Sequence, residues 1–267
     1  MSAIKQFIIC PVCEGAIGKK SQSCQICHNF YPKEIEKISA KYPLIDLTPS
    51  AFKENPDSEI KREKNLANNL FANSLFAWFY DRFLPPIWAL GLRGIGGIER
   101  EFKELVDFLG FERKIILDLS CGTGIVARRL AQKKISQYLL ALDYSEAMLQ
   151  VLRKRLKREK ISAPENFMLI RGDAESLPFE ANSLDAIYAG AAMHCWENPQ
   201  KGIEEVYRTL QPGGKLFATT FVKFLPSQKL YFFSTKELGN IFQKAGFIQD
   251  NIQIIRRGIY ATIKCIK

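Results

Sequence analysis

The chain has 267 residues, of which 47% are hydrophobic and 25% are charged, and its formal net charge is +10. This composition is typical of globular proteins and excludes a disordered, collagen-like or low-complexity chain. The length allows one large or two small domains. Two features need an explanation: the excess of basic over acidic residues, 38 against 28, and the seven cysteines.

The sequence offers no signal peptide and no membrane-spanning helix. Residues 1–10 contain one lysine and no cleavage-site pattern. The most apolar segment, residues 71–92, is interrupted by Asp81, Arg82 and two adjacent prolines. We therefore predict a cytoplasmic protein with reduced thiols, which touches a membrane at most peripherally.

Four cysteines lie close together in two C-x-x-C pairs, Cys10 with Cys13 and Cys24 with Cys27. Each pair can supply two thiolates from a tight turn, and two pairs complete the tetrahedral site that structural zinc prefers. In a reducing compartment this spacing favours zinc over disulfides. His28 directly follows the second pair, which leaves Cys24-x-x-x-His28 as an alternative to Cys24-x-x-Cys27.

Two N-terminal regions follow from these patterns. Residues 1–48 are predicted to form a zinc-ribbon module, which is too small to bury a core without its metal. Residues 49–98 begin as a polar linker and continue as an aromatic helical segment, in which apolar residues recur every three or four positions. Core packing and a mobile lid over an apolar ligand both fit this helical segment, because a glycine-rich hinge follows it.

From residue 99 onward, apolar strands alternate with amphipathic helices, the pattern of an α/β parallel sheet covered on both faces. The predicted strands span residues 114–119, 138–142, 167–170, 184–189, 215–221, 252–256 and 260–265. The predicted helices span residues 101–109, 125–134, 146–157, 199–210 and 236–245. The last two strands flank Gly258 as an antiparallel edge, so residues 99–267 should form a Rossmann-like sheet of seven strands.

A glycine-rich loop after the first of these strands is the clearest sign of a ligand site. Gly122 and Gly124 allow a ligand to approach the backbone, and the next helix points its N-terminus toward it. Asp118 precedes the loop, where an acid favours a cationic group over a pyrophosphate. Asp143 ends the second strand, where a carboxylate accepts hydrogen bonds from ribose hydroxyls. Asp173 follows the third strand, within reach of an adenine amino group.

Four ordered motifs resemble class I S-adenosylmethionine-dependent methyltransferases. They are Asp118-Leu-Ser-Cys-Gly-Thr-Gly124, Leu142-Asp-Tyr-Ser-Glu-Ala-Met-Leu149, Gly172-Asp-Ala-Glu-Ser-Leu-Pro-Phe179 and Arg208-Thr-Leu-Gln-Pro-Gly-Gly214. The whole chain resembles a cyanobacterial and plastid group with an N-terminal zinc ribbon and the run Ala-Gly-Ala-Ala-x-His-Cys-Trp, here residues 189–196. Its catalytic domain is also similar to quinone C-methyltransferases. The glycine spacing alone would equally fit a dinucleotide-binding site.

The resemblance implies S-adenosylmethionine as the cofactor. The implied contacts, by position, are Asp118, Ser120, Gly122, Gly124, Asp143, Tyr144, Met148, Asp173 and Ala174. Asp118 and Gly122 would contact the methionine end, Asp143 the ribose, and Asp173 the adenine edge together with the Ala174 backbone. Ser120 departs from the pattern, because the family carries a glycine at this position.

The methyl acceptor should bind after the fourth strand. An Asn/Asp-Pro-Pro-Tyr motif, which would indicate methylation of exocyclic amines, is absent there. His194 is the candidate general base, with an orienting or packing role beside Trp196 as the alternative. Aromatic residues around the presumed pocket, including Phe221 and Tyr231, favour an apolar or aromatic small molecule that is quinone-like or lipid-soluble.

The alternative function is an rRNA guanine-N methyltransferase with a zinc-binding RNA-recognition module. The charge distribution argues against it, because residues 1–60 hold seven basic and seven acidic residues. Residues 128–160, by contrast, hold ten basic and three acidic residues. An RNA-binding zinc module should itself be basic. The basic segment therefore predicts a solvated helix face or a contact with an anionic membrane, and the oligomeric state stays open.

Overall fold

The computed structural model describes residues 8–10, 13, 44–48, 97–110, 113–161, 167–222 and 232–267. The predicted linker and aromatic helical lid, residues 49–98, lie outside these residues except for residues 97–98, which begin α3. The helices are α3 (Gly97–Leu109), α4 (Ile125–Lys133), α5 (Glu146–Arg158), α6 (Pro199–Thr209) and α7 (Thr235–Lys244), with 3-10 turns η5 (Met193–Cys195) and η6 (Gln249–Asn251). Within these ranges, no helix is long and apolar enough to cross a membrane.

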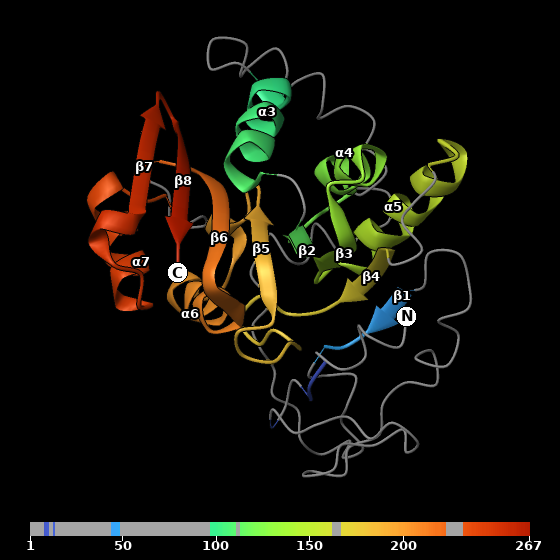
Figure 1. Cartoon of the computed structure of the whole chain (residues 1–267), viewed down its shortest axis with the longest axis horizontal. Helices are drawn as coiled ribbons and strands as arrows, with labels where there is room; N and C mark the ends of the chain where they lie inside the picture. The colour runs from blue at the N-terminus through green and yellow to red at the C-terminus, as the bar shows by residue number, and fades with distance from the viewer. Residues whose placement is uncertain are drawn as a thin grey trace.

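The strands form one mixed sheet in the order β1-β4-β3-β2-β5-β6-β8-β7 (Figure 1). They are β1 (Leu44–Asp46), β2 (Arg113–Leu119), β3 (Ser136–Asp143), β4 (Phe167–Arg171), β5 (Leu184–Ala189), β6 (Leu210–Phe221), β7 (Ile252–Arg257) and β8 (Tyr260–Ile266). The first six pair in parallel, and β8 pairs antiparallel with both β6 and β7. The predicted Rossmann-like sheet with an antiparallel edge is confirmed.

The predicted number of seven strands is wrong, because β1 adds an eighth strand beside β4. Its residues come from the segment predicted as a zinc-ribbon module. The backbone N–H of Leu47 donates to the carbonyl of Arg171 at 2.7 Å, and Asp46 forms an ion pair with Arg171 at 2.8 Å. Ile8 adds an isolated bridge to Phe179. The described N-terminal residues therefore pack on the main sheet.

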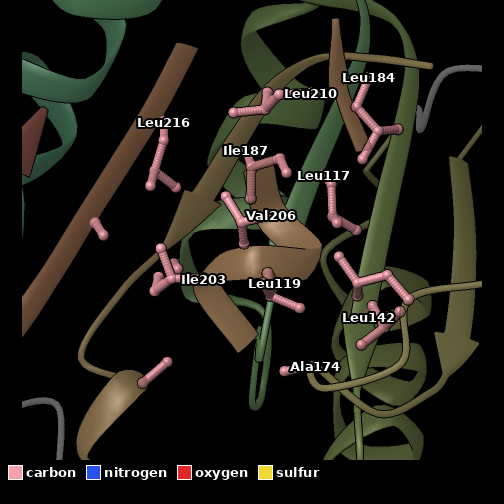
Figure 2. Packing of buried hydrophobic residues seen from close by; sticks show 14 of the residues in the cluster. Leu117, Leu119, Leu142, Ala174, Leu184, Ile187, Ile203, Val206, Leu210 and Leu216 are labelled. Atoms are coloured by element: carbon pink, nitrogen blue, oxygen red, sulfur yellow. The ribbon is translucent and has the colours of Figure 1, made fainter. Parts of the chain in front are cut away.

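Two hydrophobic layers lie on opposite faces of the sheet. Side chains of α6 and α7 cover one face, where Val206 packs among Leu117, Leu119 and Ile187 (Figure 2). Side chains of α3, α4 and α5 cover the other face. Successive strand residues point to opposite faces. Asp118, which lies between Leu117 and Leu119, therefore points to the face covered by α3 and α4.

Local sequence signals explain how the elements around the site begin. Ser145 caps α5, since its hydroxyl accepts the backbone N–H of Met148 at 3.2 Å. Asn198 caps α6 in the same way, and Pro199 occupies the first turn. Residues 211–214, which lie between the predicted helix 199–210 and the predicted strand 215–221, are part of β6, which starts at Leu210 and carries an irregularity opposite β5.

Candidate cofactor and acceptor site

The parallel strands β2, β3 and β4 end at one edge of the sheet, and the predicted cofactor residues follow them there. The loop 120–124 follows β2, Asp143 ends β3, and Asp173 lies two residues beyond β4. In the strand order, β2 stands between β3 and β5. The strand order reverses at β2, because β3 and β4 lie on one side of it and β5 and β6 on the other. Open α/β sheets bind their ligands at such a reversal.

The loop after β2 has a left-handed backbone at Ser120 (φ 56°), Gly122 (φ 55°) and Gly124 (φ 70°). A Cβ at Gly124 would lie 2.9 Å from Leu152 Cγ and closer still to both of its methyl groups. A Cβ at Gly122 would meet no atom within 4 Å. Gly124 is therefore required by packing inside the fold, whereas Gly122 leaves room for a ligand beside the backbone.

Ser120 adopts the left-handed conformation that usually favours glycine, and its side chain has a specific partner. The indole Nε1 of Trp196 donates to Ser120 Oγ at 3.0 Å. Trp196 is 6% exposed and also packs against Gly202 of α6. The departure from the family's glycine is thus compensated by a hydrogen bond that joins the loop after β2 to the segment after β5.

Asp143 joins the ends of β2 and β3. Its Oδ2 accepts the backbone N–H of Gly122 and its Oδ1 that of Ser145, both at 2.8 Å. Burial raises the pKa of Asp143 to about 6, against the lowering effect of these two donors. Each carboxylate oxygen has a second lone pair, so Asp143 can still accept from ribose hydroxyls.

Asp118 provides the best test of whether the site fits a cationic ligand. It is 1% exposed, and its Oδ2 has no hydrogen-bond partner in the part of the chain that the structure describes. Burial raises its pKa well above the usual range, and Asp143 and Glu101 add to this effect. A buried carboxylate without a counter-charge is costly, and an ammonium group would relieve that cost. The amino group of S-adenosylmethionine is such a cation, so these residues fit that cofactor.

The remaining predicted cofactor residues follow β3 and β4. Asp173 and Ala174 are each 8% exposed, and Asp173 Oδ1 accepts the backbone N–H of Glu175 at 2.9 Å. Met148 is 2% exposed in the first turn of α5. The backbone carbonyl of Tyr144 accepts a hydrogen bond from Arg171 Nε, with 3.2 Å between oxygen and nitrogen. The structure therefore brings the predicted cofactor residues to adjacent strand ends.

His194 lies in η5, after β5. It is 8% exposed, its ring meets Phe221 edge-on at 5.0 Å, and its Nδ1 has no partner among the described residues. Burial lowers the pKa of His194 to about 4, so the imidazole is neutral at pH 7. A neutral imidazole can orient a ligand, but an environment that disfavours the imidazolium also makes a weaker base.

Sequence reasoning missed a polar group at the same edge of the sheet. Glu101 of α3 accepts from Tyr260 Oη at 2.9 Å, from Thr219 Oγ1 at 3.2 Å and from the hydroxyl of Tyr188. We call these four residues the Glu101 cluster. They come from four elements, so no local motif connects them. The one signal was the position of Glu101 on the apolar side of α3, one turn before the buried Leu105.

The predicted zinc site is described in part. Cys10 is fully buried in the hydrophobic core, and the half-buried Cys13 packs against it. Cys24, Cys27 and His28 lie outside the described residues. Where side chains are described, no group of three or more His, Cys, Asp or Glu residues could hold a metal. Zinc binding therefore stays a prediction.

Residues 117–218 match the family model described as "Methyltransferase domain". The chain contains an S-adenosylmethionine-dependent methyltransferase domain. An uncharacterized chloroplastic methyltransferase of Arabidopsis thaliana is 31% identical over 237 residues, which are 83% of this chain and 64% of that relative. The chain thus spans less than two thirds of the length of this relative.

Two further comparisons concern the same domain. A demethylmenaquinone methyltransferase of Clavibacter sepedonicus is 35% identical over 106 residues, which are 40% of either chain. The crystal structure of a SAM-dependent methyltransferase from Thermotoga maritima matches with a TM-score of 0.54 at 22% identity, covering 72% of this chain and 98% of that one. The predicted enzyme class and fold of the methyltransferase domain are confirmed.

Proposed function

We propose that the protein transfers a methyl group from S-adenosylmethionine to an apolar or aromatic small molecule that is quinone-like or otherwise lipid-soluble. The assignment of the cofactor rests on Asp118 beside the glycine loop, because its buried Oδ2 has no hydrogen-bond partner among the described residues. The proposed class of methyl acceptor is supported by three aromatic side chains at the same edge of the sheet, His194, Phe221 and Tyr260, which we call the aromatic wall. It is also supported by similarity to a relative whose name gives demethylmenaquinone as its substrate.

Different residues of the methyltransferase domain would bind different groups of the cofactor. Asp118 would hold the amino group, Asp143 the ribose hydroxyls, and Asp173 the adenine edge. When bound, S-adenosylmethionine supplies an already activated methyl group. The protein therefore has to align the acceptor with that group and exclude water.

The aromatic wall consists of His194, Phe221 and Tyr260. The rings of His194 and Phe221 meet edge-on at 5.0 Å, and those of Phe221 and Tyr260 at 5.4 Å. Phe221 ends β6 and Tyr260 begins β8, so both lie at the edge where the cofactor residues gather. A wall of aromatic edges and faces favours a flat, apolar ring as its ligand.

Isothermal titration calorimetry tests the cofactor half. The wild-type chain should bind S-adenosylmethionine, and Asp143→Ala should weaken binding about 10- to 100-fold, because hydrogen bonds to a charged group contribute roughly 1.5–3 kcal/mol each. Asp107→Ala is the matched control, since Asp107 is exposed on α3. Unchanged affinity in Asp143→Ala would reject the assignment of the ribose site.

The acceptor class is tested with radiolabelled S-adenosylmethionine and extracts of cells that lack the enzyme. Label in the organic-solvent fraction after addition of the purified protein supports a lipid-soluble acceptor. Label confined to RNA would reject that acceptor and favour the rRNA methyltransferase alternative. An Asp118→Asn variant should transfer label to neither fraction, because its amide cannot neutralise the cofactor ammonium.

We also propose that Cys10, Cys13, Cys24 and Cys27 bind one structural zinc ion in a reducing compartment. The burial of Cys10 in the core, next to the hydrogen bond from Ile9 N to the carbonyl of Pro178 (3.1 Å), supports a role in anchoring the N-terminal segment. Metal analysis of the purified chain should find about one zinc per chain. The double variant Cys10→Ser/Cys13→Ser should contain none, and equal zinc in both proteins would reject the site.

A further inference from the structure

The Glu101 cluster is connected to the loop after β5, where the methyl acceptor is expected. The backbone N–H of Ala191 donates to Thr219 Oγ1 at 2.9 Å, and Ala191 has a left-handed backbone with φ 48°. A Cβ at Gly190 would overlap the hydroxyl of Tyr188. Thr219 thus fixes the backbone of Ala191, and the hydroxyl of Tyr188 leaves no room for a side chain at Gly190.

The register of the sheet places the cluster beside the cofactor site. Asp118 pairs with Tyr188 across β2 and β5, and Phe221 pairs with Tyr260 across β6 and β8. Residues directly opposite each other on neighbouring strands point to the same face. Glu101 raises the pKa of Asp118, and Asp118 raises that of Tyr188, so these groups interact across the face covered by α3.

Given the proposed methyl transfer, we propose that Glu101 is the catalytic base, and that its carboxylate binds the hydroxyl of a phenol or hydroquinone acceptor. The carboxylate takes the O–H proton while the acceptor's oxygen, or an ortho ring carbon, bonds to the methyl carbon. The bond from that carbon to the sulfonium sulfur breaks, and its electron pair stays on sulfur. After attack by carbon, the ring proton moves to the oxygen and restores the phenol. Glu101 then releases its proton to water.

The surroundings of Glu101 suit this task better than those of His194. Burial raises the pKa of Glu101 above its usual value and Glu104, on the same helix, adds to this, while the three hydroxyls lower it. Glu101 in turn raises the pKa of Asp118, the other buried carboxyl on this face of the sheet. A carboxylate of raised pKa accepts a phenolic proton more readily than an ordinary one. Both carboxylate oxygens of Glu101 already accept hydrogen bonds from hydroxyl groups, so the acceptor's hydroxyl would take the place of one of these three donors.

Binding to the product complex tests this proposal without turnover. The full chain is saturated with S-adenosylhomocysteine under anaerobic, reducing conditions, and 1,4-naphthohydroquinone is added in a calorimeter. The wild type should bind it, and Glu101→Gln should bind it about tenfold more weakly, since a charge-assisted hydrogen bond is lost. Asp107→Asn is the matched control, because Asp107 lies on the same helix, is exposed and is not among the groups that shift the pKa of Glu101. It should bind as the wild type does.

Methyl transfer from labelled S-adenosylmethionine to the same hydroquinone gives the second measurement. Glu101→Gln should lower the rate about 100-fold or more and remove its rise with pH. The affinity for S-adenosylmethionine should stay within about twofold of the wild type, since a neutral isostere leaves the cofactor contacts in place. Glu101→Asp keeps the charge and should retain the pH dependence at a reduced rate, which also covers the case in which Glu101→Gln does not fold.

Three outcomes would overturn the proposal: no binding of the hydroquinone by the wild type, equal binding and rate in Glu101→Gln, or loss of the pH-dependent step in His194→Gln but not in Glu101→Gln. The last outcome would assign the base to His194. Failure of the wild type to bind S-adenosylmethionine would instead reject the proposed function itself. The cofactor titration therefore separates the two failures.

Discussion

The hydrogen bond from Trp196 Nε1 to Ser120 Oγ (3.0 Å) allows two opposing contributions to stability to be separated. Ser120→Ala removes the acceptor and leaves a buried indole N–H without a partner, which should cost about 1–3 kcal/mol. Ser120→Gly removes the same bond but relieves the left-handed backbone (φ 56°). That relief is worth about 1–2 kcal/mol, less roughly 0.4–1 kcal/mol for the greater freedom of the unfolded chain. The glycine variant should therefore be about 1 kcal/mol more stable than the alanine variant.

Urea unfolding of both variants, in wild-type and Trp196→Phe backgrounds, measures these terms. In the Trp196→Phe background the donor is absent, so Ser120→Ala should cost less than about 0.5 kcal/mol. The glycine variant should keep its advantage there, because the backbone term does not depend on the indole. The reasoning is refuted if Ser120→Ala costs the same in both backgrounds, or if glycine is no better than alanine in either.

Three further predictions concern the same edge of the sheet. Gly124→Ala combines a left-handed φ of 70° with a collision against Leu152, so it should lower the free energy of unfolding by at least about 2 kcal/mol and Tm by about 4–8 °C. Gly122→Ala, which meets nothing within 4 Å, should cost less stability but weaken cofactor binding more, and the reverse order in calorimetry would contradict the assigned roles. Burial raises the pKa of Asp143 to about 6, and in the proposed site its ionised form would accept the ribose hydroxyls, so S-adenosylmethionine should bind about tenfold more weakly at pH 5 than at pH 8. Asp143→Asn should lack the step near pH 6, and a step retained in that variant would exclude Asp143 as its source. Asp46→Asn keeps Oδ1 as the acceptor for Thr48 and removes the charge of an ion pair whose side chains are 30% and 23% exposed. It should cost no more than about 1 kcal/mol, and a Tm decrease above about 4 °C would show that the ion pair contributes more than an exposed pair usually does.

Most of the sheet could be predicted because its strands are buried on both faces and end at polar or glycine-containing loops. The run from Leu184 to Ala189 is apolar enough that its predicted and observed bounds coincide. Asp118 and Asp143 were found because each stands where an apolar strand meets a polar loop. Burial and the hydrogen bond from Gly122 then explain why these acids differ from surface carboxylates.

The features that sequence reasoning missed depend on tertiary contacts. Strand β1 has three residues, which are too few for a periodic pattern, and it is a strand because β4 offers an open edge. The Glu101 cluster joins side chains up to 159 positions apart. An inward-facing glutamate on α3 indicates that a partner exists, but only the packing of α3 over β5, β6 and β8 shows which hydroxyls provide it.

The described N-terminal residues contact both ends of the segment that carries Asp173 and Ala174, the residues proposed to bind the adenine. Before that segment, Arg171 is held by Asp46 of β1 and in turn donates to the carbonyl of Tyr144. After it, Pro178 accepts the backbone N–H of Ile9 at 3.1 Å. The chain between these points is short, so fixing both its ends restricts where Asp173 can lie. The contacts of Asp46 and Ile9 therefore do more than attach the N-terminal residues to the sheet. They also fix the position of the residues proposed to bind the adenine.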